Sequence, residues 1–207
     1  MRQQGWRRAA KRLLDTTVAG VGLAAAAPIM AAVSVAILTT MGRPIFFMQE
    51  RPGYRGRLFR MLKFRTMKHD TSTRVDPEKD AQRLTRLGRF LRESSLDELP
   101  ELWNVLRGEM SLVGPRPLIV AYLDRYTPEQ ARRHDVLPGL TGWAQVNGRT
   151  ATTWDARFRH DLWYVDHWSL LLDLKILART VGAVLDRRGI SHEGHTSMPE
   201  YFPERPS

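Results

Sequence analysis

The chain has 207 residues, a length that predicts one domain with at most a small appendage. Hydrophobic residues make up 43% of it and charged residues 26%, with a mean hydropathy of −0.37, and this composition excludes a polytopic membrane protein. The formal charge of +10 favours a polyanionic partner: nucleic acid, an anionic membrane surface or phosphorylated small molecules. The absence of cysteine excludes disulfide scaffolds, thiolate metal sites and a cysteine nucleophile.

The first predicted element is a membrane segment. Residues Thr16–Gly42 carry no charged side chain over 27 positions, and about 20 apolar residues suffice for a helix to span a bilayer. A cleaved signal peptide is the first alternative, because basic residues precede the segment and Ala24–Ala26 resembles a cleavage site. The apolar run continues well past those alanines and Pro28 follows them closely, so cleavage is disfavoured.

The topology of this segment has two interpretations. Pro28 lies in its middle, where it removes a backbone donor and kinks a helix. Basic residues mark the cytoplasmic side of a membrane, and here they flank both ends of the segment, with eight Lys or Arg against the single acid Glu50 between Arg43 and Lys68. This symmetry favours a re-entrant segment bent at Pro28, and a kinked spanning helix is the alternative.

The following elements are predicted from turn residues and apolar spacing. Two short strands, residues 44–49 and 58–67, surround a Gly/Pro turn at 51–56 and form a hairpin. A polar loop is expected at 69–80 and a helix at 82–91. Three further signals are a helix that stops at Gly108, a capping box that opens at Thr127, and two helices between Trp154 and Arg188 with Ser169 as the cap between them.

The first of the two C-terminal helices is rich in aromatic residues, which permits two interpretations. Either it lies at the membrane interface, as aromatic and basic residues together indicate, or its aromatic side chains form an ordinary core face. Five aromatic residues carry this signal: Trp154, Phe158, Trp163, Tyr164 and Trp168. The end of the chain, from Met198, holds three prolines and is expected to be loosely packed.

The candidate centre of chemistry is the adjacent pair Asp97 and Glu98. The default explanation is structural, since Ser95 and Glu98 have the spacing of a capping box and acids complement a helix N-terminus. Two observations favour a functional role instead. Pro100 fixes the backbone next to the pair, and the surrounding motifs are rich in arginine.

Three basic motifs accompany this pair. In Gly114–Pro117 two prolines fix the backbone around Arg116, as a rigid mount for a phosphate contact would require, although an ordinary turn has the same signals. A glycine-rich segment from Gly139 ends in Arg149 and matches neither a dinucleotide fingerprint nor a P-loop. Strand alternation places Lys63 and Arg65 on one sheet face, which on its own indicates a solvated face.

Long motifs in this chain resemble those of the bacterial sugar transferases, the small monotopic phosphoglycosyl transferases. The resemblance covers nearly the whole chain and is carried by KRLLD from Lys11, PIFF from Pro44, KFRTM from Lys63, SLDELPELWNVL from Ser95, MSLVGPRP from Met110, PGLTGWAQVNGR from Pro138 and DHWS from Asp166. It implies an α+β monotopic membrane protein with a proline-bent re-entrant helix at 1–43, a catalytic domain with a short β-hairpin and interfacial helices at 44–190, and a tail at 191–207.

The activity that the resemblance implies is transfer of a sugar-1-phosphate from a nucleoside diphosphate sugar, expected to be a uridine one, to polyprenyl (undecaprenyl) phosphate, with release of nucleoside monophosphate. By the same resemblance, Asp97 is the nucleophile and Glu98 is associated with Mg²⁺, and both carboxylates are expected to ligate the ion. The positions expected to bind substrate phosphates are Lys63, Arg65, Arg92, Arg116 and Arg149. Members of the family commonly have Ser-Pro at the membrane bend, where this chain has Ala27 and Pro28.

The implied location is the cytoplasmic face of a bacterial inner membrane, with anionic lipid as a further partner and no nucleic acid. The rival interpretation is a non-catalytic, membrane-anchored basic module that binds anionic lipid or nucleic acid. Its binding would be strongly salt dependent, and Asp97 would be dispensable.

Overall fold

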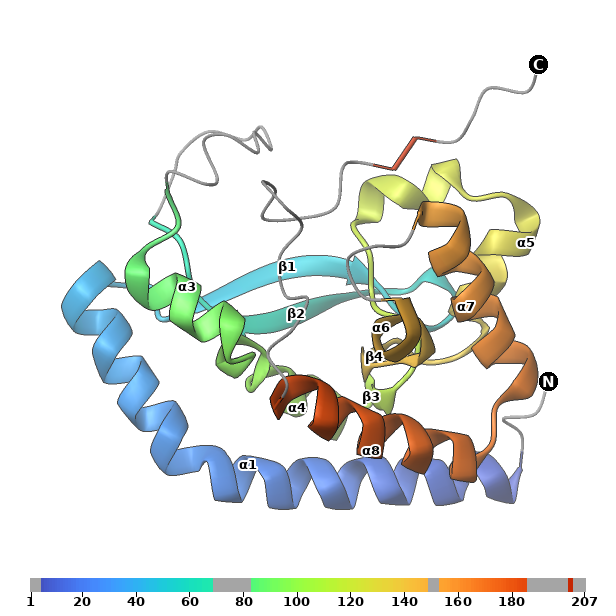
Figure 1. Ribbon diagram of the computed structural model, residues 1–207, viewed down its shortest axis with the longest axis horizontal. Coiled ribbons are helices and arrows are strands. Elements are labelled where there is room, and N and C mark those ends of the chain that lie inside the picture. The colour runs from blue at the N-terminus through green and yellow to red at the C-terminus, as the bar shows by residue number, and fades with distance from the viewer. Residues whose placement is uncertain (1–4, 69–82, 149–152, 186–200, 203–207) are drawn as a thin grey trace.

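A computed structural model describes residues 5–68, 83–148, 153–185 and 201–202. The fold mixes helix and sheet: a long N-terminal helix runs along one edge, a two-stranded hairpin crosses the middle, and shorter helices surround both (Figure 1). The main elements are α1 (Trp6–Met41), β1 (Phe46–Pro52), β2 (Leu58–Phe64), α3 (Arg86–Glu93), α4 (Glu101–Arg107), β3 (Ser111–Val113), α5 (Pro128–Ala131), β4 (Gly139–Thr141), α6 (Trp143–Gly148), α7 (Trp154–His167) and α8 (Leu170–Leu185).

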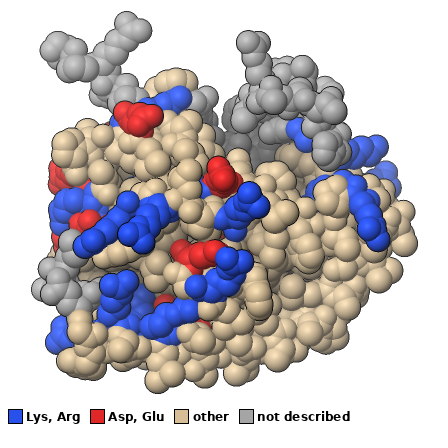
Figure 2. All heavy atoms as spheres, turned by 180° about the vertical axis from the view of Figure 1, so that it is seen from behind, with Lys and Arg blue, Asp and Glu red and all other residues tan. Residues whose placement is uncertain are grey.

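Helix α1 contains the predicted membrane segment. Its 36 residues correspond to about 54 Å of helix, and it bends part-way along, as expected for a helix with Pro28 inside it (Figure 1). Among the described residues it is the one helix long and apolar enough to cross a membrane, and only 11% of its apolar window is buried. The opposite face of the molecule is free of charged side chains at its lower right, where α1 runs (Figure 2). A long apolar helix thus leaves most of its surface without protein contacts.

The predicted hairpin is present, with slightly different limits. β1 and β2 pair antiparallel from Phe46 opposite Phe64 to Pro52 opposite Leu58, and a 3₁₀ turn at Tyr54–Gly56 joins them. The second strand ends at Phe64 and not at Met67, so Arg65 lies outside the alternation that was predicted to align it with Lys63. The Arg65 guanidinium instead donates to the carbonyl oxygens of Met41, Gly42 and Arg43, where it satisfies the C-terminus of α1.

Capping residues correctly predicted three helix limits, at Gly108, Thr127 and Ser169, and one predicted helix begins later than expected. Thr127 forms the expected capping box with Gln130, Gly108 ends α4 at a φ of 80°, and Ser169 Oγ accepts from the backbone N–H of Leu172. The helix predicted at 82–91 begins only at Arg86, because Thr85 is extended and its side chain accepts from Gly88. The predicted loop at 69–80 lies outside the described residues.

The aromatic residues of α7 are mostly core residues. Phe158, Tyr164 and Trp168 are buried, so the core interpretation is right for them, whereas Trp163 is partly exposed and stacks on Trp143 with ring centroids 4.6 Å apart. The exposed apolar face belongs to α8, where Leu171 is 77% exposed.

The C-terminal tail was expected to be loosely packed, and residues 201–202 are the part of it that the structure describes. Tyr201 is buried, and its backbone N–H donates to the Tyr122 hydroxyl. Arg125 in turn donates to the carbonyl oxygen of Tyr201. At this position the tail is therefore packed against the domain.

A buried polar network joins α1 to the C-terminal helices. The Lys11 ammonium lies 2.6 Å from a carboxylate oxygen of Asp173 on α8 and 3.2 Å from the Val113 carbonyl oxygen of β3. The same carboxylate accepts from the Tyr164 hydroxyl at 2.7 Å and from the Trp168 indole at 3.0 Å. One buried carboxylate therefore joins α1, α7 and α8, and Lys11 extends this network to β3.

We expect Asp173→Asn to lower the free energy of unfolding by about 3–5 kcal/mol, because it removes the nearer carboxylate of the buried Lys11 charge and leaves only Asp15, at 3.9 Å, as a counterion. Urea unfolding in mild detergent, followed by tryptophan fluorescence, measures this. Asp166→Asn is the matched control, since it breaks the exposed pair with Arg132 and should change stability by at most about 1 kcal/mol. Equal effects of the two substitutions would contradict this role for Asp173.

Candidate active site

The pair Asp97 and Glu98 lies in a 3₁₀ turn, Leu96–Glu98, between α3 and α4. Ser95 opens this turn in the left-handed region, at a φ of 56°, and its side chain makes no capping hydrogen bond. Pro100 immediately precedes α4 instead of lying in its first turn. The capping box that was the default explanation for the pair is therefore absent, and the two acids are fixed by a strained turn next to a proline.

Glu98 is held between two cations. Lys63 Nζ from β2 lies 2.7 Å from Glu98 Oε1, and the Arg116 guanidinium donates to both carboxylate oxygens, as in a bidentate pair. Burial alone would raise the pKa of Glu98, but Arg116 and Lys63 outweigh it and hold that pKa well below its usual range. Glu98 is thus an anion at every physiological pH.

Asp97 has the opposite environment, although it is the adjacent residue. Its side chain is buried, with the residue only 8% exposed. Burial and the neighbouring Glu98 charge raise the pKa of Asp97 to about 6, while Lys63, Arg116 and Arg92 oppose the shift. Two carboxyl groups with pKa values driven apart by their surroundings are typical of a site where each has its own chemical role.

A third acid, Glu101, completes the cluster and was not singled out in the sequence. It is 1% exposed, and its Oε1 lies 3.1 Å from Lys63 Nζ, so one ammonium serves both Glu98 and Glu101. Burial and the Glu98 charge raise the pKa of Glu101 to about 7. The signal that could have found it is the spacing of three residues from Glu98, which places two side chains on one side of a helical turn.

The backbone around Arg116 is held by a buried ion pair as well as by its two flanking prolines. Arg133 donates to the carbonyl oxygen of Arg116 at 2.8 Å and forms a fully buried ion pair with Asp161 of α7 at 2.7 Å. This pair fixes the backbone that carries Arg116. It was not predicted, because its two residues are 28 positions apart in the chain.

The glycine-rich segment from Gly139 packs closely against the backbone that precedes Arg116. β3 and β4 pair in parallel, and a Cβ at Gly139 would lie 2.1 Å from the backbone nitrogen of Gly114. At Gly142 it would lie 2.2 Å from the Gly114 carbonyl oxygen. Only glycine permits this approach, so these two glycines position the strand that precedes Arg116.

Of the remaining predicted site residues, Arg92 lies near the acids and Arg65 does not. Arg92 on α3 donates to the Thr66 hydroxyl and contributes to the field at Asp97. Arg65 is turned to the end of α1, as described above, and makes its hydrogen bonds there. Arg149 lies outside the described residues. Lys63, Arg92 and Arg116 thus surround the acids.

Comparison with known families agrees with the motifs that carry this cluster. The family model described as bacterial sugar transferase matches residues 6–187. The chain belongs to the bacterial sugar transferase family. The match includes α1, the hairpin and the complete acid cluster, and the enzymes of this family are transferases.

The names of two similar proteins state a reaction. The chain is 48% identical over 92% of its length to an uncharacterized sugar transferase, EpsL, of Bacillus subtilis, of which it covers 95%. It is 44% identical to a UDP-glucose:undecaprenyl-phosphate glucose-1-phosphate transferase of Xanthomonas campestris and 39% identical to an undecaprenyl-phosphate galactose phosphotransferase of Salmonella typhimurium. Each of these two matches includes 86% of this chain but only 39% and 41% of the relative. The chain therefore spans about two-fifths of those two enzymes.

The raised pKa of Glu101 predicts a pH-dependent stability. Since the value of about 7 lies above the ordinary 4.5, the folded chain keeps a proton that the unfolded chain has lost between these pH values. The free energy of unfolding should therefore fall as the pH rises, with about 1 kcal/mol lost between pH 6 and 7.5. Glu101→Gln should remove most of this loss in urea unfolding and leave the smaller contribution of Asp97, and Glu109→Gln should keep the whole loss. An unchanged pH dependence in Glu101→Gln would refute the assignment.

Proposed function

We propose that this chain transfers a sugar-1-phosphate from a UDP-sugar to undecaprenyl phosphate and releases uridine monophosphate. The relatives named for this reaction support the substrates, and the acid cluster supports the chemistry. The observation that carries the proposal is the contrast between Asp97 and Glu98, with one carboxylate clamped by two cations and its neighbour buried beside them.

The proposed chemistry has two displacements on one phosphorus. An Asp97 carboxylate oxygen attacks the phosphorus that carries the sugar, and the bond from this phosphorus to the bridging oxygen breaks, so the nucleoside monophosphate leaves with the electron pair. A phosphate oxygen of undecaprenyl phosphate then attacks the same phosphorus and releases the Asp97 carboxylate. A covalent intermediate of this kind divides one difficult transfer into two easier steps.

The surrounding cations have defined parts in this scheme. Arg116 and Lys63 hold Glu98 in place and present further N–H groups to phosphate oxygens, which carry the negative charge in phosphoryl transfer. Arg92, on α3, adds positive charge next to Asp97. Arg149 is proposed as a further phosphate contact on the basis of its motif.

The donor set at the acids fits a magnesium ion. Mg²⁺ is commonly bound through one or two carboxylates together with substrate phosphates and water, so it does not need a cage of protein ligands. The adjacent carboxylates of Asp97 and Glu98 are such a pair of oxygen ligands. The raised pKa of Asp97 also indicates a carboxylate whose charge a cation would stabilise. Asp97 and Glu98 would hold the ion, which neutralises diphosphate charge when bound.

The nucleophile is tested without an acceptor. The chain incubated with donor alone should gain the mass of one phosphosugar and release nucleoside monophosphate, and Asp97→Asn, which preserves the size of the side chain, should abolish both. Asp124→Asn, an exposed acid, is the control and should form the adduct normally. Adduct formation should slow as the pH falls, because burial and the Glu98 charge raise the pKa of Asp97 and protonation removes the attacking carboxylate. Full turnover by a folded Asp97→Asn chain would end this proposal.

The metal is tested by removal. A chelator should suppress adduct formation, and added Mg²⁺ should restore it. Glu98→Gln should raise the Mg²⁺ concentration needed for half-maximal rate by tenfold or more, since a neutral amide is a weaker ligand for a hard cation. Glu109→Gln should leave this concentration unchanged. Adduct formation that is insensitive to chelation would argue against the ion.

We also propose that α1 enters the cytoplasmic leaflet of the bacterial inner membrane, bends at Pro28 and returns to the same face. Basic residues flank both ends of its apolar part, and the bend of the helix supports a return to the side of entry (Figure 1). The exposed apolar side chains of α8 support an interfacial position for this helix beside α1.

This topology predicts that residues 5 and 45 lie on one side of the membrane. Cysteines introduced at Gly5 and Ile45 in a chain without native cysteine should both resist an impermeant thiol reagent in intact cells and both react in inverted vesicles. Pro28→Leu restores a backbone donor and should shift the segment toward spanning, so that one of the two sites becomes accessible from outside. Different labelling of the two sites in the parent chain would disprove re-entry.

A further inference from the structure

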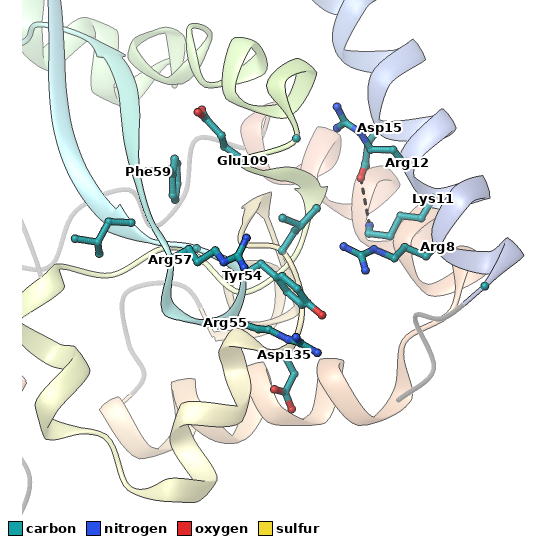
Figure 3. Close-up of a pocket in the computed structure, with 15 residues that line it drawn as sticks. Arg8, Lys11, Arg12, Asp15, Tyr54, Arg55, Arg57, Phe59, Glu109 and Asp135 are labelled. Atoms are coloured by element: carbon teal, nitrogen blue, oxygen red, sulfur yellow. Dashed lines mark ion pairs between the residues drawn. The ribbon is translucent and has the colours of Figure 1, made fainter.

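A cavity lies outside the acid cluster. It has a volume of about 650 Å³ and is formed by the N-terminal end of α1, the turn of the β1–β2 hairpin and the segment that follows α4. Figure 3 shows Arg8 and Lys11 reaching in from α1, and Arg55 and Arg57 from the hairpin turn, on opposite sides of the Tyr54 ring. Its basic side chains thus come from segments that are more than 40 positions apart.

The unsatisfied charge in this cavity is positive. Arg8, Arg55 and Arg57 make no ion pair with any of the described residues, and two of them, Arg8 and Arg55, lie over the Tyr54 ring at 5.2 Å. The Tyr54 ring therefore orients the Arg8 and Arg55 guanidinium groups, and no carboxylate in the described part of the chain neutralises either of them or Arg57.

Two of the three acids that line the cavity are engaged elsewhere. Asp15 accepts from the Leu112 backbone and lies 3.9 Å from Lys11, and Glu109 accepts from Asn104. Lys11 in turn pairs with Asp173. Asp135 alone then faces three unpaired arginines, so the cavity is suited to an anion.

The cavity is separate from the proposed catalytic site. Lys63, which contacts Glu98, lies five residues along β2 from Leu58 at the edge of the cavity, and this corresponds to about 17 Å of strand. Likewise, the cavity touches Gly108 and Glu109 after the C-terminal end of α4, whereas the acids lie at its N-terminal end. A donor phosphate bound at Asp97 therefore leaves this cavity open.

The position of the cavity along α1 indicates what it binds. Arg8, Lys11 and Arg12 line it and are the last basic residues before the uncharged run from Thr16. Leu13, directly after them, is 71% exposed. A helix that enters a bilayer keeps such residues at the level of the lipid headgroups. At this depth, phosphate groups with one negative charge are the abundant anions.

We infer that this cavity is a binding site for the phosphate headgroup of an anionic phospholipid, held by Arg8 and Arg57 on either side of Tyr54. This inference rests on the membrane placement proposed above for α1 and does not depend on the transfer reaction. An occupant here ties the start of α1 to the hairpin turn, so the lipid fixes the helix relative to the domain that carries the catalytic acids.

The test uses the full chain, purified in mild detergent and depleted of lipid. Dioleoyl phosphatidylglycerol is titrated, and the bound lipid is counted by native mass spectrometry, with dioleoyl phosphatidylcholine as the uncharged-headgroup reference. We expect one phosphatidylglycerol to bind at least tenfold more tightly than phosphatidylcholine. Arg8→Gln combined with Arg57→Gln should remove most of this preference. Arg86→Gln combined with Arg89→Gln is the matched control, because it removes the same charge from exposed positions of α3 and should retain the preference.

Each other outcome would overturn the inference. Equal losses in the two double variants would mean diffuse attraction to the whole basic surface, and no loss in either would mean that the cavity binds no lipid. Displacement of phosphatidylglycerol by millimolar inorganic phosphate would indicate a soluble anion, and displacement by equimolar undecaprenyl phosphate would indicate an acceptor site. Adduct formation from donor alone is measured in parallel, so a failure of the proposed reaction is distinguished from a failure of lipid binding.

Discussion

The buried contact between Lys11 and Asp173 is the constraint on which the arrangement of this molecule depends. It joins the beginning of α1 to the beginning of α8, and the hydroxyl of Tyr164 and the indole of Trp168 complete the coordination of the same carboxylate. A buried ion pair tolerates very little displacement, because each charge left alone in the interior is costly. The apolar helix is thereby locked to the domain at its charged end, while the part beyond Thr16 exposes most of its surface.

A buried ion pair also positions the acid cluster, where its effect is to make two neighbouring carboxyl groups differ in pKa. Arg133 and Asp161 neutralise each other in the interior, and through the Arg116 backbone they hold a guanidinium against Glu98. Arg116 and Lys63 are directed to Glu98 and not to Asp97. Burial and the Glu98 charge therefore raise the pKa of Asp97 by more than these cations lower it. Adjacent positions in the chain thus become a permanent anion and a carboxylate that titrates near neutral pH.

The two sites proposed for this chain both depend on arginines held by the fold. At the acid cluster, prolines, close-packed glycines and a buried ion pair hold Arg116. In the cavity at the start of α1, an aromatic ring orients Arg8 and Arg55. Immobilised guanidinium groups lose little conformational entropy when a phosphate binds. A chain with a formal charge of +10 can therefore concentrate phosphorylated ligands at two places.

Local features of this protein were determined by the sequence alone, because they depend on residues that are near one another in the chain. The apolar segment, the hairpin, the caps at Thr127 and Ser169 and the conspicuous pair at Asp97 and Glu98 belong to this class. The tertiary structure decided which side chains meet across long separations. It showed that Arg65 satisfies the end of α1, that Glu101 shares Lys63 with Glu98, and that the aromatic residues of α7 mostly form core. The physical reason is that burial and charge pairing depend on neighbours in space, which spacing along a chain does not specify.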